Sequence, residues 1–338
     1  MEMARLAYEF LGESPRNEKF ARPVPGKRPF LKRKRKKITR IIKKLLTGWR
    51  VMNTIAMITL YYPEESVRKN IVQVSMLVDT VILLDNTPDY DNSASFSDIK
   101  NVEYVALKRN CGLSEAYNYY LKTIKENCYI IFFDQDSYCP ENLVGKLKND
   151  YKICCEKLNR KGIIGPAYFE RNANRLMLPK QKKVVEKGLY EVNSIITSGM
   201  FTELEVMRKI GFWNGEIFLD MADWDVCWRI EKAGMFCCLS ENVVLTHSLG
   251  KGVHGFAGVK IKEGASFRIY YQIRDGLYLL SKDYVPLKFW IRFILMLTVR
   301  PIVHFLVLPN KKKRIHYLLK GIRDYRKKMH GALGEELK

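Results

Sequence analysis

The chain has 338 residues, of which 47% are hydrophobic and 12% aromatic, which suffices for one large α/β domain with appendages and excludes a wholly disordered chain. Lys and Arg outnumber Asp and Glu by 58 to 36, giving a formal net charge of +22. Residues 22–50 contribute +13 and residues 288–328 contribute +11, so the rest of the chain is close to neutral at −2. Basic flanks suit nucleic acid or an anionic membrane, and the apolar character of the second flank favours the membrane.

The eight cysteines give no sign of a zinc site or of a disulfide framework. They include no CxxC pair, and the two adjacent pairs have the wrong spacing for a zinc knuckle. Residues 1–20 are too polar for an export signal. We therefore expect reduced cysteines that fill the core of a cytoplasmic protein.

Residues 1–51 form the first predicted segment. Residues 1–28 contain several prolines and no apolar periodicity, so we expect them to be flexible. A basic run over residues 32–37 is followed by residues 38–46, whose apolar positions predict a short helix with one apolar and one basic face. Such a helix suits an anionic membrane surface, and the alternative is a solvated tail.

Apolar segments after residue 53 predict an α/β fold with a mostly parallel sheet. We expect buried strands at residues 55–60, 80–84, 102–107 and 129–133, and helices at residues 64–77 and 112–125. Strand, helix and strand in this order form right-handed βαβ units, in which helices flank a twisted sheet. No GxGxxG follows the first strand and no GxxxxGK[ST] occurs, so another feature must hold any bound phosphates.

Polar side chains follow three of the predicted strands. Thr59 and Tyr61 lie at the end of the first, Asp85 follows the second, and Asp134-Gln135-Asp136 follows the fourth. In an open parallel sheet, ligands bind outside these carboxyl ends. Two carboxylates at i and i+2 can reach one hard cation, and Mg²⁺ or Mn²⁺ accepts oxygen ligands and bridges diphosphates. The pattern indicates a metal-assisted diphosphate site.

Over residues 53–333 the chain resembles the family 2 glycosyltransferases, which have a GT-A fold, and within them the bacterial rhamnosyltransferase branch. The resemblance rests on motifs that occur in the family's order. They are Thr59 to Pro63 with Asp85, Arg109 to Asn118 (RNCGLSEAYN), Phe133 to Ser137 (FDQDS), Thr197 to Met200 (TSGM), Phe218 to Arg229 (FLDMADWDVCWR), His247 to Gly250 (HSLG) and Tyr270 to Asp275 (YYQIRD).

The resemblance implies a role for each matched residue. An inverting transfer needs a general base that deprotonates the acceptor hydroxyl, and Asp223 aligns with the family's base. Because Ala222 stands where the family usually has glutamate, Asp220 remains the alternative. The other implied residues are Thr59, Tyr61, Asp85, Asn110, Gly112, Asp134 and Arg274 for the donor, Ser198, Gly199, Asp225, Trp228 and Arg229 for the acceptor, and Asp134, Asp136 and His247 for Mg²⁺ or Mn²⁺.

Several of these residues also have a structural alternative. Asp85 is expected to accept a hydrogen bond from the N3–H of uracil or thymine, but it could be an ordinary aspartate in a strand-end turn. Asp225 could orient Arg229 or cap the helix expected over residues 224–234. Arg274 suits the donor phosphates, and a salt bridge is its alternative.

Residues 287–338 are expected to associate with the membrane. Residues 289–308 are apolar but carry Arg292, Arg300 and Pro301, which argue against a membrane span. Two short amphipathic helices in the interface, over residues 287–299 and 301–308, fit better, and the basic run over residues 311–314 would then meet anionic headgroups. The alternative is a helical pair packed on the catalytic domain, residues 52–286, or on a partner subunit.

The predicted function is the transfer of a sugar, with dTDP-rhamnose as donor, to an undecaprenyl-diphosphate-linked glycan in cell-surface polysaccharide biosynthesis. We expect the enzyme to work from the cytoplasm as a peripheral protein on the inner face of the cell membrane. Another donor such as a UDP-sugar is the first alternative, a non-catalytic scaffold is another, and a homodimer stays open. A nucleic-acid-binding protein would leave the acidic cluster without a role, so we expect no nucleic-acid partner.

Overall fold

The computed structural model describes residues 52–170, 175–179, 182–247, 252–256, 259–263, 265–307 and 311–333, and for residues 170, 175, 247, 252–256, 259–263 and 300–307 it describes the backbone alone. All described residues belong to one compact unit within Met52–Lys338. The basic run and the helix predicted within residues 1–51 lie outside them, as do residues 248–250 of the predicted His-Ser-Leu-Gly motif.

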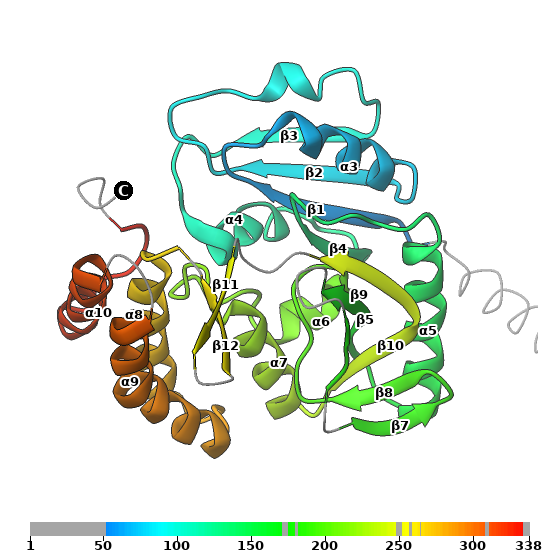
Figure 1. Ribbon diagram of the computed structural model, residues 1–338. Helices are drawn as coiled ribbons and strands as arrows, with labels where there is room; N and C mark the ends of the chain where they lie inside the picture. The colour runs from blue at the N-terminus through cyan, green and yellow to red at the C-terminus, as the bar shows by residue number, and fades with distance from the viewer. Residues whose placement is uncertain are drawn as a thin grey trace, which may run out of the picture. The chain divides into compact units, whose positions relative to one another are not determined.

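Strands and helices alternate through the first half of this unit, and helices dominate its end (Figure 1). The strands are β1 (Thr54–Leu60), β2 (Thr80–Asp85), β3 (Val102–Ala106), β4 (Tyr129–Asp134), β5 (Gly162–Glu170), β6 (Arg175–Met177), β7 (Lys182–Glu186), β8 (Leu189–Val192), β9 (Met200–Glu203), β10 (Phe236–His247), β11 (Gly252–Phe256) and β12 (Val259–Glu263). The helices are α3 (Glu65–Ser75), α4 (Gly112–Leu121), α5 (Leu143–Leu158), α6 (Leu204–Lys209), α7 (Ala222–Lys232), α8 (Arg268–Leu280), α9 (Leu287–Val307) and α10 (Lys311–Arg326), with a 3₁₀ turn at Ser93–Ser95.

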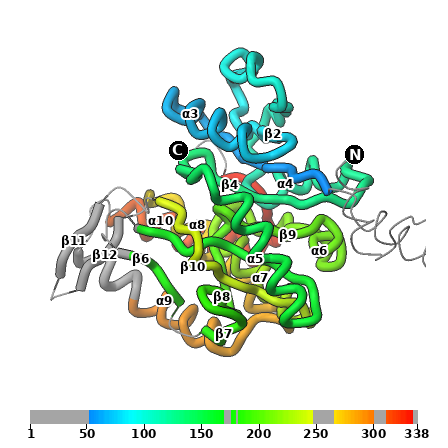
Figure 2. Tube along the Cα trace, turned by 90° about the vertical axis from the view of Figure 1, so that its right-hand side faces the viewer, coloured from blue at the N-terminus to red at the C-terminus, as the bar shows by residue number. Residues whose placement is uncertain are grey.

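The main sheet is parallel where the sequence predicted it and mixed beyond. Its strand order is β3-β2-β1-β4-β9-β5-β10-β8-β7, with β6 paired to β5. The four predicted strands pair in parallel, and β9 enters antiparallel between β4 and β5. Figure 2 shows α3 and β2 at one end of the sheet and β7 and β8 at the other. The α/β prediction is therefore confirmed, with a mixed extension in which β5 and β10 pair in parallel and the other strand pairs are antiparallel.

Alternating side chains along the strands divide the core into two layers. In β4, Ile130 and Phe132 face one layer, and Ile131 and Phe133 face the other. Apolar residues of α3 and α5 fill the second layer, and those of α4, α6 and α7 fill the first. Because both faces are covered, the strands read as continuous apolar runs rather than as alternating ones.

The C-terminal helices pack on the first layer. Phe289 and Phe293 of α9 are buried in the main core, and the close approach of α8 requires Gly276, where an added Cβ would lie 2.0 Å from the Phe293 ring. Helices α8, α9 and α10 lie side by side in Figure 1. Helix α9 is thus anchored to the core of the α/β unit by its aromatic side chains.

Helix α9 corrects one prediction. The sequence predicted two helices separated at Pro301, whereas α9 is a single helix from Leu287 to Val307. A proline removes one backbone donor from a helix, and here that single loss does not end it. None of the described helices is long and apolar enough to cross a membrane. All eight cysteines are free, and seven are buried.

Candidate active site

The carboxyl ends of β1, β2 and β4 bring the predicted strand-end residues to one edge of the sheet. In the parallel register Thr59 pairs with Asp134, and Leu60 pairs with Asp85. Asp134 is half-buried and Asp136 is exposed. The Asp-x-Asp pair therefore stands on a turn at the open edge, where a ligand can reach both carboxylates.

Gln135, between these aspartates, joins their turn to the segment after β1. Its side-chain oxygen accepts a hydrogen bond from the Tyr61 amide at 2.8 Å, and its side-chain nitrogen donates to the Tyr61 carbonyl at 3.3 Å. These two hydrogen bonds between the Gln135 side chain and the Tyr61 backbone hold Tyr61 beside the Asp-x-Asp turn. Gln135 lies within the sequence motif, but the spacing of the two aspartates did not predict a role for the residue between them.

Ser198 and Gly199 support the same turn from the inside. The Ser198 hydroxyl is hydrogen-bonded to that of Ser137 and accepts a bond from the Asp134 amide at 3.5 Å. Gly199 has φ +81°, and a Cβ there would lie 2.7 Å from the Pro166 ring. Both residues are buried, so the structure gives them a supporting position rather than the acceptor-facing position that the resemblance implied.

The segment that leads to the candidate base is held at Phe218 by two helices. The Leu113 amide in the first turn of α4 donates to the Phe218 carbonyl at 2.8 Å, and Asp275 of α8 accepts a bond from the Phe218 amide at 3.0 Å. Gly112 permits this approach because it has φ +80° and an added Cβ would lie 2.4 Å from the Phe218 oxygen. The start of α4 thus packs on this segment, and Gly112, which the resemblance assigned to the donor, has a structural contact there.

Asp223 in the first turn of α7 is a half-buried carboxyl whose pKa lies near neutral pH. Burial raises the pKa of Asp223 to about 7; the hydrogen bond from the Trp224 amide, 2.9 Å long, opposes this rise, and the charges of Asp134 and Asp220 add to it. A carboxyl whose pKa lies near the working pH can accept a proton and hold it. The three aspartates therefore form one electrostatic cluster.

Arg268, the first residue of α8, lies in this cluster and was missed by the sequence analysis. Its Nη2 lies 2.5 Å from Asp220 Oδ1, and its Nε lies 3.3 Å from Asp220 Oδ2. Desolvation lowers the pKa of Arg268, but the negative charges of Asp220, Asp134 and Asp223 raise it by more. The pKa therefore lies above the ordinary value for arginine. The resemblance implied Arg274, because that residue lies in the matched motif, but Arg268 and Arg274 point about 120° apart on a helix.

Arg274 and Asp225 belong to buried ion pairs outside this cluster. Arg274 Nε lies 2.6 Å from Asp275 Oδ1, and the Arg274 side chain is 2% exposed. Asp225 is fully buried and accepts bonds from Arg229 Nε at 2.7 Å and from the Tyr284 hydroxyl at 2.6 Å. Arg229 also donates to two backbone carbonyls at 2.7 Å. The expected donor contact of Arg274 and acceptor contacts of Asp225 and Arg229 are thus replaced by structural contacts.

Asp85 and Asn110 also bind neighbouring residues of the chain. The buried Asp85 carboxylate accepts bonds from Asn92 Nδ2 and the Tyr104 hydroxyl, both at 2.7 Å, and from the Thr87 amide at 2.8 Å. The Asn110 side chain accepts a bond from the Gly112 amide at 3.1 Å. Asp85 therefore stabilises the turn after β2, which is the structural alternative that its sequence position left open.

The donor set for a metal consists of carboxylates on one turn. Among the described residues, no group of three or more His, Cys, Asp or Glu is arranged to hold a metal ion. His247 ends β10, and its side chain is outside the description. Asp134 and Asp136 fit a Mg²⁺ or Mn²⁺ ion that takes its remaining ligands from water and a diphosphate, which is how Mg²⁺ is usually bound.

An aromatic pocket of about 370 Å³ adjoins the start of α7. Trp224 and Trp228 line it together with Phe289 and Arg292 of α9. The Trp228 and Phe289 rings lie 4.9 Å apart, and the Arg292 guanidinium lies 4.8 Å from the Trp224 ring centre. The pocket offers apolar ring faces and a cation, and Trp224 in its wall directly follows Asp223 in the chain.

Comparisons with known proteins point to the same chemistry. Residues 57–197 match the sequence model of Glycosyl transferase family 2. The chain is 27% identical over 289 residues to the dTDP-rhamnosyl transferase RfbF of Shigella flexneri, covering 80% of this chain and 93% of that protein.

Two solved structures share the fold at lower identity. The S. aureus TarS structure of residues 1–349 in complex with UDP-GlcNAc has a TM-score of 0.52 and 11% identity, covering 82% of this chain and 81% of that one. A second S. aureus TarS structure has a TM-score of 0.53 and 10% identity, covering 85% of this chain and 50% of that one.

Proposed function

We propose that the chain, as a family 2 glycosyltransferase with a GT-A fold, transfers rhamnose from dTDP-rhamnose to a lipid-linked glycan acceptor with inversion at the anomeric carbon. The donor proposal is supported by the likeness to a dTDP-rhamnosyl transferase along most of both chains. The observation that carries the mechanism is the cluster of Asp134, Asp220 and Asp223 at the open edge of the sheet.

In this proposal Asp223 is the general base. Its pKa of about 7 allows it to take the proton of the acceptor hydroxyl as that oxygen attacks the anomeric carbon. Asp220 is the weaker candidate, because both of its carboxylate oxygens are bound by Arg268. The structure thus supports the first of the two assignments that the sequence left open.

Arg268 and the Asp-x-Asp turn act on the leaving group. Arg268 cannot lose its proton at working pH and can bind phosphate oxygens in a forked geometry, so we assign it the role expected for Arg274. Asp134 and Asp136 would hold a divalent cation, which would neutralise the charge that develops on the departing diphosphate. Binding of donor phosphates by Arg268 would weaken its pairing with Asp220.

The acceptor is proposed to approach along the aromatic pocket and α9. Trp224 and Trp228 offer ring faces for a sugar, and Arg292 offers a cation. Five apolar residues on the outer side of α9 are at least half exposed, and they recur at helical spacing on one stripe: Leu287, Ile291, Ile294, Leu295 and Val299. A stripe of this kind supports peripheral attachment to a membrane that carries the lipid-linked acceptor.

A donor panel tests the proposed reaction. Purified protein is incubated with dTDP-rhamnose, UDP-GlcNAc or UDP-glucose, with membrane-extracted lipid-linked acceptor and Mn²⁺ or Mg²⁺, and release of the nucleoside diphosphate is measured. We expect turnover with dTDP-rhamnose and its loss in EDTA. Preferred turnover of a UDP-sugar would leave the family assignment intact and overturn the proposed donor.

Membrane attachment is tested separately. The variant Ile291→Ser/Ile294→Ser/Leu295→Ser should lose sedimentation with anionic vesicles in high salt, because burial of apolar side chains is not screened by ions. The variant Leu176→Ser/Leu178→Ser, which changes exposed leucines elsewhere, is the matched control. Equal sedimentation of both variants would contradict the assignment of the membrane face to α9.

A further inference from the structure

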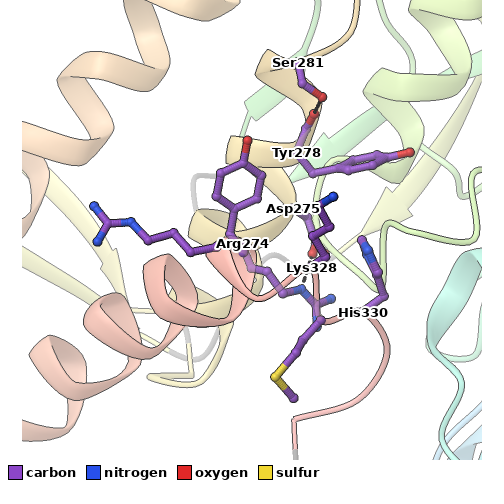
Figure 3. Close-up of a pocket in the computed structure, with 9 residues that line it drawn as sticks. Arg274, Asp275, Tyr278, Ser281, Lys328 and His330 are labelled. Carbon is purple, nitrogen blue, oxygen red and sulfur yellow. Dashed lines mark hydrogen bonds and ion pairs between the residues drawn. The ribbon is translucent and has the colours of Figure 1, made fainter.

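A second pocket of about 370 Å³ lies between α8 and the end of α10, apart from the catalytic cluster (Figure 3). Its lining includes Arg274 and Tyr278 from α8 and Arg326, Lys328 and His330 from the end of α10 and the segment after it. Asp134, Asp220 and Asp223 do not line it. The proposed transfer reaction gives this pocket no role.

The wall of the pocket contains a buried cation with an unused donor. The Arg274 side chain is 2% exposed; its Nε binds Asp275 at 2.6 Å, and its Nη1 donates to the Gly331 carbonyl at 2.6 Å and to the Tyr270 hydroxyl at 3.3 Å. Its Nη2 is buried and has no hydrogen-bond partner among the described residues. Burying a donor without a partner is unfavourable, because the donor loses its hydrogen bond to water and gains none in return, so a ligand or water is expected to meet it.

The charges around this donor favour an anion. Arg274, Arg326 and Lys328 line the pocket with Asp275 as the one acidic lining residue, and Arg326 and Lys328 are exposed at the rim. Asp275 is committed to Arg274 Nε and to the Phe218 amide. His330 Nδ1 pairs with Glu216 Oε2 at 2.5 Å. The fixed charges therefore leave a positive excess in the pocket.

The end of α10 places Lys328 in an unusual conformation at this rim. The Lys328 amide donates to the Tyr325 carbonyl at 2.9 Å, and the Met329 amide donates to the Asp324 carbonyl at 2.9 Å, which together form a Schellman motif. Lys328 has φ +55°, at the position where glycine is usual. This turn sends the chain back across α8, where the Gly331 carbonyl meets Arg274 and the Leu333 amide donates to the Tyr271 hydroxyl.

We propose that this pocket binds a phosphate monoester, with the phosphate held by Arg274 Nη2, Arg326 and Lys328. The one remaining donor of Arg274 and the two cations Arg326 and Lys328 match the double charge and several acceptor oxygens of a phosphate monoester better than the single charge of a carboxylate. Tyr278, Tyr325 and Met329 add apolar wall against which the rest of the ligand can lie. The phosphate belongs either to a soluble ester or to the headgroup of an anionic lipid.

Binding of inorganic phosphate to the full chain tests the site without any measurement of transfer. Titration calorimetry should show saturable binding to the wild type. The variant Arg326→Gln/Lys328→Gln should bind about tenfold more weakly or worse, since it removes two of the three cations that hold the phosphate. The control Lys312→Gln/Arg323→Gln makes the same charge change at exposed positions of α10 outside the lining and should bind as the wild type does.

Two results would overturn the proposal: absence of phosphate binding by the wild type, or an equal loss in the control, which would indicate a general charge effect. Because Arg274→Gln would leave the buried Asp275 carboxylate without its partner and could unfold the chain, the variant Arg326→Gln/Lys328→Gln is used for the test.

Vesicles of phosphatidylcholine with and without phosphatidic acid then distinguish a lipid headgroup from a soluble phosphate ester. Weaker binding of the rim variant than of the control to phosphatidic acid vesicles supports a lipid headgroup, and equal vesicle binding with lost phosphate binding supports a soluble ester.

Discussion

The substitution Asp223→Asn should stabilise the fold increasingly as pH rises above about 4, while it sharply lowers turnover. The pKa of Asp223 is about 7 in the folded chain, and an aspartate in an unfolded chain ionises at about 4. Between these values the unfolded state has lost the proton and the folded state retains it. The contribution of Asp223 to the free energy of unfolding is therefore fully present below pH 4 and falls as pH rises towards 7.

The size of this effect follows from the two pKa values. Each pH unit between them removes about 1.4 kcal/mol, so the loss amounts to about 4 kcal/mol by pH 8. Asparagine has nearly the same volume and no charge to desolvate, so Asp223→Asn should match the wild type near pH 4 and exceed it by up to that amount at pH 8. Turnover of the variant should fall by about 10²–10⁴-fold, the usual effect of losing a general base.

Urea unfolding in EDTA at pH 4, 5, 6, 7 and 8 measures the difference between the two proteins. EDTA is needed because a cation near Asp134 would favour the ionised form of Asp223 and lower its pKa. The variant Asp220→Asn is the control, since it removes a neighbouring carboxylate that Arg268 binds and should keep most of the pH dependence. A difference between wild type and Asp223→Asn that is constant from pH 4 to pH 8 would refute the raised pKa and the base assignment with it.

Three further predictions concern the rest of the site. Asp136→Ala should abolish transfer and leave the melting temperature unchanged, because Asp136 is exposed; activity that survives in this variant or in EDTA would contradict a metal on the Asp-x-Asp turn. Arg268→Gln should raise the KM for the donor and lower kcat, which donor titration would detect, and an unchanged kcat/KM would remove Arg268 from the donor site. Gly112→Ala should lower the melting temperature, measured by calorimetry, because its Cβ would lie 2.4 Å from the Phe218 oxygen; a wild-type melting curve would show that the two segments can separate freely.

The parallel half of the sheet could be predicted from the sequence because each strand is buried on both faces. The run Tyr129-Ile130-Ile131-Phe132-Phe133 has no polar residue until Asp134, so its pattern gave both the strand and the position of the carboxylate. The predicted helix that begins at Gly112 ends at Leu121 rather than at residue 125, and the predicted strand at residue 102 ends at Ala106. Such end positions depend on local turns that apolar periodicity does not encode.

The polar contacts of the site could not be predicted in the same way, because they join residues far apart in the chain. Arg274 is kept from the donor side by Asp275 and by the Gly331 carbonyl, 57 residues away. Asp85 is enclosed by Tyr104, which belongs to a different strand. A motif shows which residue type stands at a position, but the packing of α10 on α8 decides which arginine of α8 faces the carboxylates.

The aspartates of the site divide into those that hold the fold and those that remain for chemistry. Asp275 pairs with a buried arginine and fixes the Phe218 amide, while the Leu113 amide fixes the carbonyl of the same residue. Because both backbone polar groups of Phe218 are hydrogen-bonded, the segment that follows it starts from a fixed position. Asp223 lies five residues later, at the start of α7. The position of the proposed base therefore depends on α4 and α8, so substitutions that loosen either helix should lower turnover before they unfold the protein.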